Sequence, residues 1–539
     1  MIRDKINKWL KENNLEGKTE HPALEKFGDF AIRTGKPVEN LTKSDLVEKT
    51  EFVAGFVNIW LDRKYLLKES LNIDTKEWYE NLEKVGNQKT MVIDYSAPNI
   101  AKPFGIGHLR STNIGQAIYN IYQILGWKCI GDNHIGDWGT QFGKLIVAIK
   151  KWGPPATIGI NDLSIEDLEK LYVKFHSESE NNSELLDEAR DWFLKLEKGD
   201  EEARIIWQKC IEVSMREFDK VYELLGVKID HTLGESFYLD KMPEVVELMK
   251  KKGLVKESQG AKIIEFPNMP PAMVVKTNGA TTYFTRDMAT VKYRIDTWNP
   301  DLIIYEIGAD QKLHCRQIIE TAKMMDWRPQ FYNVAHGLIR WKDGKFSTRK
   351  GATIHLMEVI EKAIEEAKKI APDNSEDKLK AVAIGAIKFN DLASDPKKDV
   401  IFDWDKVMSM DGNSGPYLQY TYARCKSVLD KSKTLSASGH LSLTGQANIE
   451  LYVFNDEETA LLRYFYQYEE KIMEAGERFS PSVLAEYLIN LARKYNEFYG
   501  KWRIVGEKEE LQRAWLTDRT AVILKSGLKI LGIEVLEKM

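Results

Sequence analysis

The 539-residue chain has few of the features that mark exported, membrane-bound or metal-clustered proteins. Its four cysteines lie at least 81 residues apart, which gives neither a disulfide framework nor a metal-ligand cluster. No apolar run is long enough to span a membrane, and the charged amphipathic start, MIRDKINKWLKENN, lacks the apolar centre of a secretory signal. We therefore expect a cytoplasmic protein with no membrane partner and no metal site of its own.

The chain also lacks a surplus of basic residues. Its 77 Lys and Arg residues against 82 Asp and Glu residues give a net charge of −5. Because contacts to phosphates need Lys and Arg, this balance does not by itself favour a nucleic-acid partner. Local basic faces can nevertheless hold RNA on an acidic protein. The composition is that of a globular protein, and the length predicts about three or four domains.

The stretch from Thr90 to Thr112, TMVIDYSAPNIAKPFGIGHLRST, has a pattern typical of ligand binding. Residues Met91 to Tyr95 are apolar and favour a strand, and the residues after His108 favour a helix. The apolar residues at helical spacing are Ile114, Ile118, Ile121 and Leu125. Between strand and helix, Gly105 and Gly107 allow close backbone approach at a helix N-terminus, which favours an anion. The pattern predicts phosphate binding, although such a loop can also be an ordinary connector.

Five more blocks follow, and the six together resemble class I aminoacyl-tRNA synthetases of the arginyl family, in that family's order. The blocks are KPFGIGHLRST (102–112), DNHIGDWGTQFG (132–143), YFTRD (283–287), GADQ (308–311), KFSTRKG (345–351) and DGNSGPYLQYTYAR (411–424). The resemblance implies an arginine–tRNA ligase. Such an enzyme activates arginine with ATP to arginyl-adenylate and transfers it to the 3′ end of tRNA(Arg), releasing AMP and pyrophosphate.

The predicted fold class is α/β, with a doubly wound parallel sheet of Rossmann type in the catalytic domain, because strands alternate with helices and glycines follow the strands. We expect three parts: an N-terminal α+β domain at 1–88, the catalytic domain at 89–375 and a helical domain at 376–539. The catalytic domain is expected to carry a helical insertion at about 150–225, without an editing site. The resemblance assigns tRNA elbow contacts to the first part, which could otherwise be a plain accessory domain, and anticodon binding to the last.

An arginine pocket is implied by the resemblance at Tyr283, Asp287 and Gln311, with Asp94 and Asn99 holding the α-amino and carboxylate ends. The chemistry fits, because a guanidinium is planar and carries five donors, which a carboxylate and a phenol oxygen can accept. If Asp287 opens a helix, the phenol and the carboxylate can converge. From the residues alone, Asp287 could equally be a helix cap beside a packed Tyr283.

The ATP site is assigned by the same resemblance. The residues implied in ATP binding are Gly105, Gly107, His108, Lys345 and Ser347. Charge stabilisation in catalysis is assigned to Lys102, His108 and Lys345. We expect Mg²⁺ to arrive with ATP, since it usually binds through phosphate oxygens and water. We also expect arginine activation to need tRNA, and a monomeric protein.

Two positions depart from the family's pattern. Gly105 stands where the first signature usually has its first His, and Thr348 replaces the second Lys of the second signature. His134 and Lys102 are the nearest candidates to compensate for the missing imidazole. The departures leave two alternatives open: a weakened or inactive tRNA-binding paralogue, and a different class I transferase. Retention of the five arginine-pocket residues argues against both.

Overall fold

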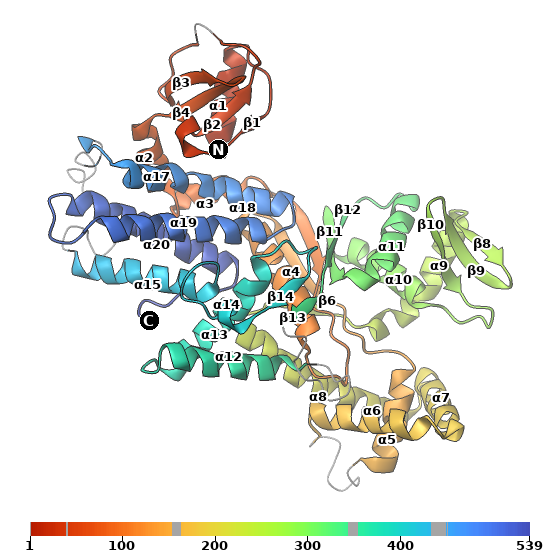
Figure 1. Cartoon of the computed structure of the whole chain (residues 1–539). Helices are drawn as coiled ribbons and strands as arrows, with labels where there is room; N and C mark the ends of the chain where they lie inside the picture. Colours follow the sequence, from red (N-terminus) through yellow and green to blue (C-terminus); the bar gives the residue numbers. More distant parts are fainter. Residues whose placement is uncertain (1, 39–40, 154–162, 343–353, 433–448, 450) are drawn as a thin grey trace. The chain divides into compact units, whose positions relative to one another are not determined.

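The computed structural model describes residues 2–38, 41–153, 163–342, 354–432, 449 and 451–539 (Figure 1). It divides into two compact units. The first, here called the helical unit, consists of residues 1–85, 364–393 and 404–539. The second, here called the sheet unit, consists of residues 86–363 and 394–403. None of the helices in the described ranges is long and apolar enough to cross a membrane.

The sheet unit is built on a five-stranded parallel sheet with the order β12-β11-β5-β6-β7. Its strands are β5 (Thr90–Asp94), β6 (Lys128–Asn133), β7 (His231–Thr232), β11 (Leu302–Gly308) and β12 (Gln330–His336). Val92, Ile93, Ile303 and Ile304 are fully buried, so these strands are covered on both faces, as parallel sheets usually are. The predicted doubly wound α/β class is confirmed.

Helices connect the parallel strands, because a parallel pair cannot be joined by a tight turn. The connecting helices are α4 (Ile106–Ile124), α10 (Tyr283–Trp298) and α11 (Lys312–Met324). The core on one part of the sheet joins Val92, Ile130 and Ile303 to Met288 of α10 and Ile318 of α11. The carboxyl ends of β5 and β11 are thereby fixed next to the N-terminal turns of α10 and α11.

Two insertions extend the sheet unit. The first is helical, with α5 (Gln141–Trp152), α6 (Ile165–Ser179), α7 (Ser183–Glu197) and α8 (Glu201–Leu225). As predicted, a capping box at Ser164 and Asp167 starts α6, and Gly226 ends α8 in the left-handed region with φ 61°. The second contains η3 (Glu235–Lys241), α9 (Met242–Lys251) and an antiparallel sheet of β8 (Val255–Ser258), β9 (Ala261–Phe266) and β10 (Met269–Val275).

One predicted strand, Tyr332 to Ile339, is divided in the structure. It becomes the end of β12 and a separate strand, β13 (Ile339–Trp341), which pairs in parallel with β14 (Val400–Phe402). The chain after residue 376 is therefore not helical throughout. A short apolar run gives no signal of where one strand ends and the next begins, so periodicity alone could not place this break.

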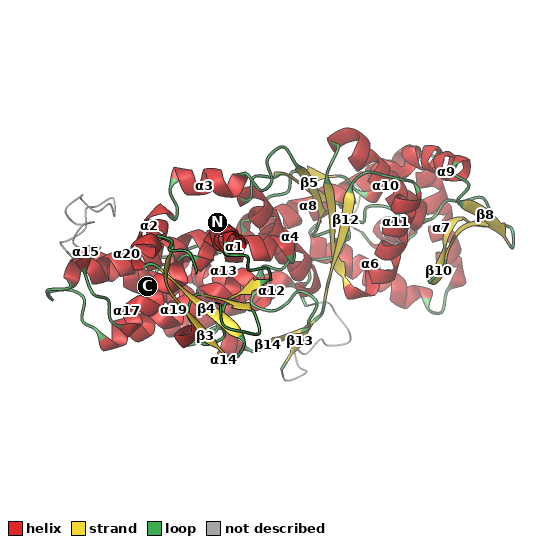
Figure 2. Ribbon diagram, turned by 90° about the horizontal axis from the view of Figure 1, so that it is seen from above, coloured by secondary structure: helices red, strands yellow, loops and turns green. Residues whose placement is uncertain are grey.

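The helical unit contains an N-terminal α+β part and a set of helices, seen in red against the few yellow strands in Figure 2. The α+β part has α1 (Ile2–Glu12), an antiparallel sheet of β1 (Thr19–Glu20), β2 (Phe30–Arg33), β3 (Val47–Val53) and β4 (Phe56–Leu61), then α2 (Arg63–Asn72) and α3 (Lys76–Glu83). The longer helices that follow are α13 (Glu376–Leu392), α15 (Gly415–Lys431), α17 (Asp456–Phe465), α18 (Gln467–Glu477), α19 (Ser482–Lys501) and α20 (Glu510–Ile530). Helix α12 (Leu356–Ile370) contributes residues to both units.

Candidate active site

A cavity of about 430 Å³ lies at the carboxyl ends of β5 and β11, where ligands bind in open parallel sheets. All five residues predicted for the arginine pocket line it: Asp94, Asn99, Tyr283, Asp287 and Gln311. These residues come from three separate segments of the sequence. The structure therefore brings together, around one cavity, the side chains that the family resemblance implied.

The loop after β5 is strained where it reaches this cavity. Ser96, Ala97 and Ala101 all have positive φ, at 74°, 45° and 63°. For residues other than glycine, each such conformation costs about 1–2 kcal/mol. The N–H group of each donates to a side chain of another element, and the acceptors are Ser111 Oγ, Asn133 Oδ1 and Ser214 Oγ at 2.9–3.0 Å. These bonds hold the loop in the shape that presents Asn99 to the cavity.

Position 136 requires glycine because it lies very close to Asn99 of this loop. Asn99 and Gly136 form an isolated parallel bridge between the loops that follow β5 and β6. A Cβ atom at position 136 would lie 2.4 Å from Asn99 Oδ1. Any side chain at Gly136 would therefore displace the Asn99 amide, which explains one glycine of the IGDWG block.

A buried charge cluster fixes Asp94 in the cavity wall. The Arg294 side chain is fully buried on α10, and its Nη2 lies 2.7 Å from Asp94 Oδ2. Its Nε donates to Asp132 Oδ2 at 2.8 Å. Burial raises the pKa of Asp132, and the charge of Arg294 opposes that rise. One guanidinium thus faces two carboxylates beside this wall of the cavity.

Asp287 is held by two histidines, and neither was predicted to lie in the arginine pocket. Its Oδ2 accepts a hydrogen bond from His314 Nε2, and its Oδ1 lies 3.5 Å from His134 Nε2. Burial alone would raise the pKa of Asp287, but the hydrogen bonds and charges of the two imidazoles hold it well below its usual range. The carboxylate is therefore ionised at neutral pH.

Tyr283 is placed differently from the expectation. Helix α10 begins at Tyr283, so Asp287 lies in its second turn and does not open the helix. The Tyr283 side chain is 62% exposed, and its ring centroid is 4.7 Å from that of His314. The phenol and the carboxylate of this helix are linked through His314, which contacts both.

The N-terminus of α4 is the predicted phosphate site. Gly105 is its N-cap residue, with φ −85°, and the Gly105 N–H donates to His108 Nδ1 at 3.2 Å. Burial, with a smaller contribution from Lys102, lowers the pKa of His108 to about 4. The imidazole is therefore neutral at pH 7 and, because Nδ1 accepts, carries its proton on Nε2. His108 can act as a hydrogen-bond donor at this helix end but not as a cation.

Gly107 and Lys102, at this end of the helix, leave space that a ligand could occupy. A Cβ atom at Gly107 would meet nothing within 4 Å, so the protein's own packing does not require glycine there. Lys102 is exposed, with its Nζ 6.0 Å from the ring centroid of Tyr172. Lys345, Ser347 and Thr348 lie outside the described residues.

Several residues around the cavity were missed by the sequence reasoning. They include Glu235, Arg294, Tyr305 and His314. Helical spacing was the available signal, because His314 is three residues after Gln311 and Arg294 is seven after Asp287. His134, expected as a substitute donor for the missing imidazole at Gly105, instead lines this cavity with both ring nitrogens directed at other groups.

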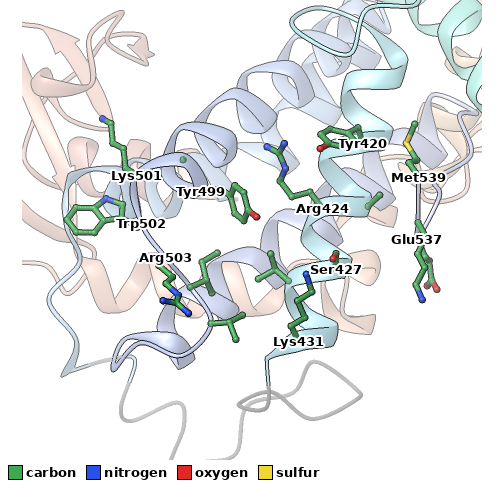
Figure 3. A pocket seen from close by; sticks show the side chains of 16 residues that line it. Tyr420, Arg424, Ser427, Lys431, Tyr499, Lys501, Trp502, Arg503, Glu537 and Met539 are labelled. Atoms are coloured by element: carbon green, nitrogen blue, oxygen red, sulfur yellow. The ribbon is translucent and has the colours of Figure 1, made fainter. Parts of the chain in front are cut away.

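A second pocket, of about 970 Å³, lies in the helical unit between α15, α19 and the C-terminal residues (Figure 3). Arg424 of α15 lies between two tyrosine rings, 4.8 Å from the centroid of Tyr420 and 5.0 Å from that of Tyr499. Trp502 and Met539 also line the pocket. Aromatic faces beside a guanidinium are suited to stacking with a nucleobase.

Two known families match parts of the chain. Residues 73–404 match the family described as "tRNA synthetases class I (R), catalytic domain". Residues 418–539 match the "DALR anticodon binding domain". The first match contains the cavity around Asp287 and the α4 N-terminus, and the second contains the pocket around Arg424.

Full-length relatives agree with these matches. The chain is 39% identical to the arginine–tRNA ligase of Halothermothrix orenii and 38% identical to that of Clostridioides difficile, over 100% of this chain and 98% of each relative. Among solved structures, the arginyl-tRNA synthetase of Plasmodium falciparum superposes with a TM-score of 0.84 at 25% identity, and covers 100% of this chain and 99% of its own. The Thermus thermophilus arginyl-tRNA synthetase, at 21% identity with the same coverage, has the same fold, with a TM-score of 0.83.

Proposed function

We propose that the cavity around Asp287 binds arginine and that the α4 N-terminus binds ATP, on the premise that this chain belongs to the class I arginyl-tRNA synthetase family. The chain is an arginine–tRNA ligase, as its full-length relatives indicate. The family's reaction uses ATP, arginine and tRNA. What is proposed here is which residues of this chain carry each part of that reaction.

The arginine assignment rests on one observation above all, the meeting of the five predicted residues around one acidic cavity. Asp287 is proposed to receive the guanidinium, with Tyr283 and Gln311 beside it. Asp94, held by Arg294, is proposed to receive the α-ammonium group. Asn99, on the strained loop, is proposed to bind the carboxylate end. A ligand that is cationic at both ends fits carboxylates placed at two separate points of the wall.

In the reaction, the arginine carboxylate attacks the α-phosphate of ATP, and the adenylate then reacts with the ribose at the tRNA 3′ end. No protein nucleophile is needed, because holding the two reactants in line and stabilising the phosphate charge are sufficient. We assign the second task to the α4 N-terminus, the neutral Nε2–H donor of His108 and the exposed cation of Lys102. Lys345 and Ser347 stay assigned to the same task from the sequence.

Mg²⁺ is proposed to enter with ATP. Among the described residues, no group of three or more His, Cys, Asp or Glu side chains is placed to hold a metal ion. Mg²⁺ usually takes its ligands from phosphate oxygens and water. When bound, the ion would supply positive charge beside the phosphates.

For tRNA, the pocket around Arg424 is proposed to accept a base of the anticodon, because it combines exposed aromatic faces with a cation inside the region that matches the anticodon-binding family. The N-terminal part, 1–88, is proposed to contact the tRNA elbow, with 89–375 as the catalytic domain and 376–539 as the anticodon-binding domain. A monomeric state and a cytoplasmic location are proposed from the sequence.

The test is an aminoacylation assay with purified protein, ATP, labelled arginine and tRNA(Arg). We expect one AMP and one pyrophosphate for each arginyl-tRNA formed, with no charging by lysine or citrulline. Absence of any charging would support the inactive paralogue, and charging by another amino acid would support a different class I enzyme. If tRNA is omitted, arginine-dependent pyrophosphate exchange should be negligible, and robust exchange would refute the proposed tRNA requirement.

A further inference from the structure

His134 has a hydrogen-bonding geometry that fixes where its protons are. Its Nδ1 lies 3.1 Å from the carbonyl oxygen of Leu233, and a carbonyl can only accept, so Nδ1 carries a hydrogen. Its Nε2 faces Asp287 Oδ1 at 3.5 Å. A neutral ring would therefore direct the lone pair of Nε2 at a carboxylate, which is repulsive. Protonation at both nitrogens converts this contact into an ion pair.

The charges around His134 favour the same form. Its side chain is 14% exposed. The titratable and charged groups that face it are Asp94 of β5, Asp132 of β6, Asp137 of its own loop, Glu235 and Tyr238 of η3, and Asp287 and Arg294 of α10. His314 of α11 contacts the same Asp287 carboxylate. Carboxylates outnumber cations in this set. Burial lowers the pKa of His134, but Asp287 and Asp94 outweigh burial and raise it to about 9.

We propose that His134 is a positioning residue for Asp287: before arginine binds, its imidazolium holds the carboxylate in place, and it releases its Nε2 proton when the guanidinium arrives. The inference rests on the proposed function, namely that this cavity binds arginine. It adds to that function a residue that acts through Asp287 and a proton that leaves with each binding event.

His134 releases its proton because two cations, the imidazolium and the guanidinium, compete for one carboxylate in a poorly solvated cavity. A guanidinium cannot lose its proton in a protein, whereas an imidazole can. The proton therefore leaves from His134 to the solvent. The Nδ1–H bond to Leu233 does not depend on Nε2, so the neutral ring keeps its position. Only a ligand with a permanent positive charge drives this exchange, which selects arginine over neutral citrulline.

The proton count can be measured by isothermal titration calorimetry of arginine into the full-length protein at pH 7.0, in phosphate and in Tris buffer. We expect release of about 0.5–1 proton per arginine, and because binding that releases protons tightens with pH, a Kd that falls roughly three- to tenfold from pH 6.5 to 7.5. His134→Asn, which can still donate to Leu233, should show no proton release and a flat Kd. His231→Asn is the matched control, because this histidine is exposed on β7 and stacks on Trp298; it should behave as wild type.

Two results would overturn the inference. One is arginine binding to the wild-type protein with a proton count near zero, and this result needs no variant. The other is a proton count in His134→Asn equal to that of wild type. A wild-type protein that binds no arginine in this titration would overturn the proposed function as well, and is distinguished from the first result by the absence of a binding isotherm.

Discussion

The two ends of the candidate active site differ in how they handle charge. At the arginine end, three carboxylates that line the wall have built-in partners: Asp287 has two imidazoles, Asp94 has Arg294 and Glu235 has Arg286 at 3.0 Å. At the ATP end, the described side chains are a neutral His108 and an exposed Lys102 beside the open space at Gly107.

The difference follows from the ligand that each end receives. A small cation must be matched by carboxylates, and buried carboxylates need partners because an unpaired buried charge costs several kcal/mol. Phosphates can be bound by backbone N–H groups and a helix N-terminus, which need no buried side-chain charge. The arginine end is therefore the more specific of the two.

The largest expected effect is at the arginine end. Asp287→Ala would leave the guanidinium without its carboxylate, and should lower kcat/KM for arginine by about 3–5 kcal/mol, which is more than a hundredfold. The KM for ATP should change little. Steady-state aminoacylation measures both, with Asp296→Ala, an exposed position on the same helix, as the control. Arginine use within a few-fold of wild type would show that the pocket assignment is wrong.

At the ATP end, a substitution is expected to increase the rate of activation, with a smaller effect than that of Asp287→Ala. A His at position 105 could donate to a phosphate oxygen, and the ordinary φ of Gly105 accommodates any residue. Such a bond to a charged group is worth roughly 1.5–3 kcal/mol, so Gly105→His should speed activation by roughly 10- to 150-fold and lower the ATP KM. Steady-state aminoacylation across ATP concentrations tests this. An inactive wild type that the substitution does not revive would favour the non-catalytic paralogue.

A substitution in the pocket around Arg424 should change the use of tRNA without changing the arginine end or the ATP end of the candidate active site. Tyr499→Ala removes a ring on which a base can stack. The KM for tRNA should rise by the factor that corresponds to a loss of about 1–3 kcal/mol of binding free energy. The KM values for arginine and ATP should stay unchanged. Tyr499→Phe keeps the ring and is expected to behave as wild type. Equal tRNA KM values for the Ala and Phe variants would remove this pocket from the tRNA interface.

The smallest expected effect is on stability. The His134 pKa is raised from 6.5 to about 9 in the folded protein. The contribution of protonated His134 to the free energy of unfolding is therefore complete below pH 6.5 and is lost as pH rises through 9. The contribution should be about 1–2 kcal/mol, because His314 continues to hold Asp287 after the proton leaves. Thermal unfolding of wild type and His134→Asn should therefore converge between pH 6.5 and 9. If the difference in thermal stability between the two proteins does not narrow over this pH range, His134 does not titrate within it.

Most of the fold and part of the site could be predicted from the sequence. Strands β5 and β6 and the caps at Ser164 and Gly226 follow from local patterns, since apolar runs and capping residues act within a few positions. The partners of Asp287 could not be predicted in this way. His134 and His314 reach it from segments separated by 180 residues, and only the folded sheet brings them together.

The strained loop after β5 illustrates the same limit. Its sequence, YSAPNIA, gives no sign that three of its residues have positive φ, because that conformation is maintained by acceptors on α4, α8 and the end of β6. The division of the predicted strand at 332–339 likewise depends on pairing with residues 400–402, more than 60 positions away.

A crystal structure of the protein with bound arginine tests the central claim most directly. The account predicts the guanidinium within hydrogen-bonding distance of the Asp287 carboxylate, the α-ammonium group at Asp94 and the carboxylate end at Asn99, directed toward the α4 N-terminus. Arginine bound in the opposite orientation, or at a site that does not include Asp287, would contradict it.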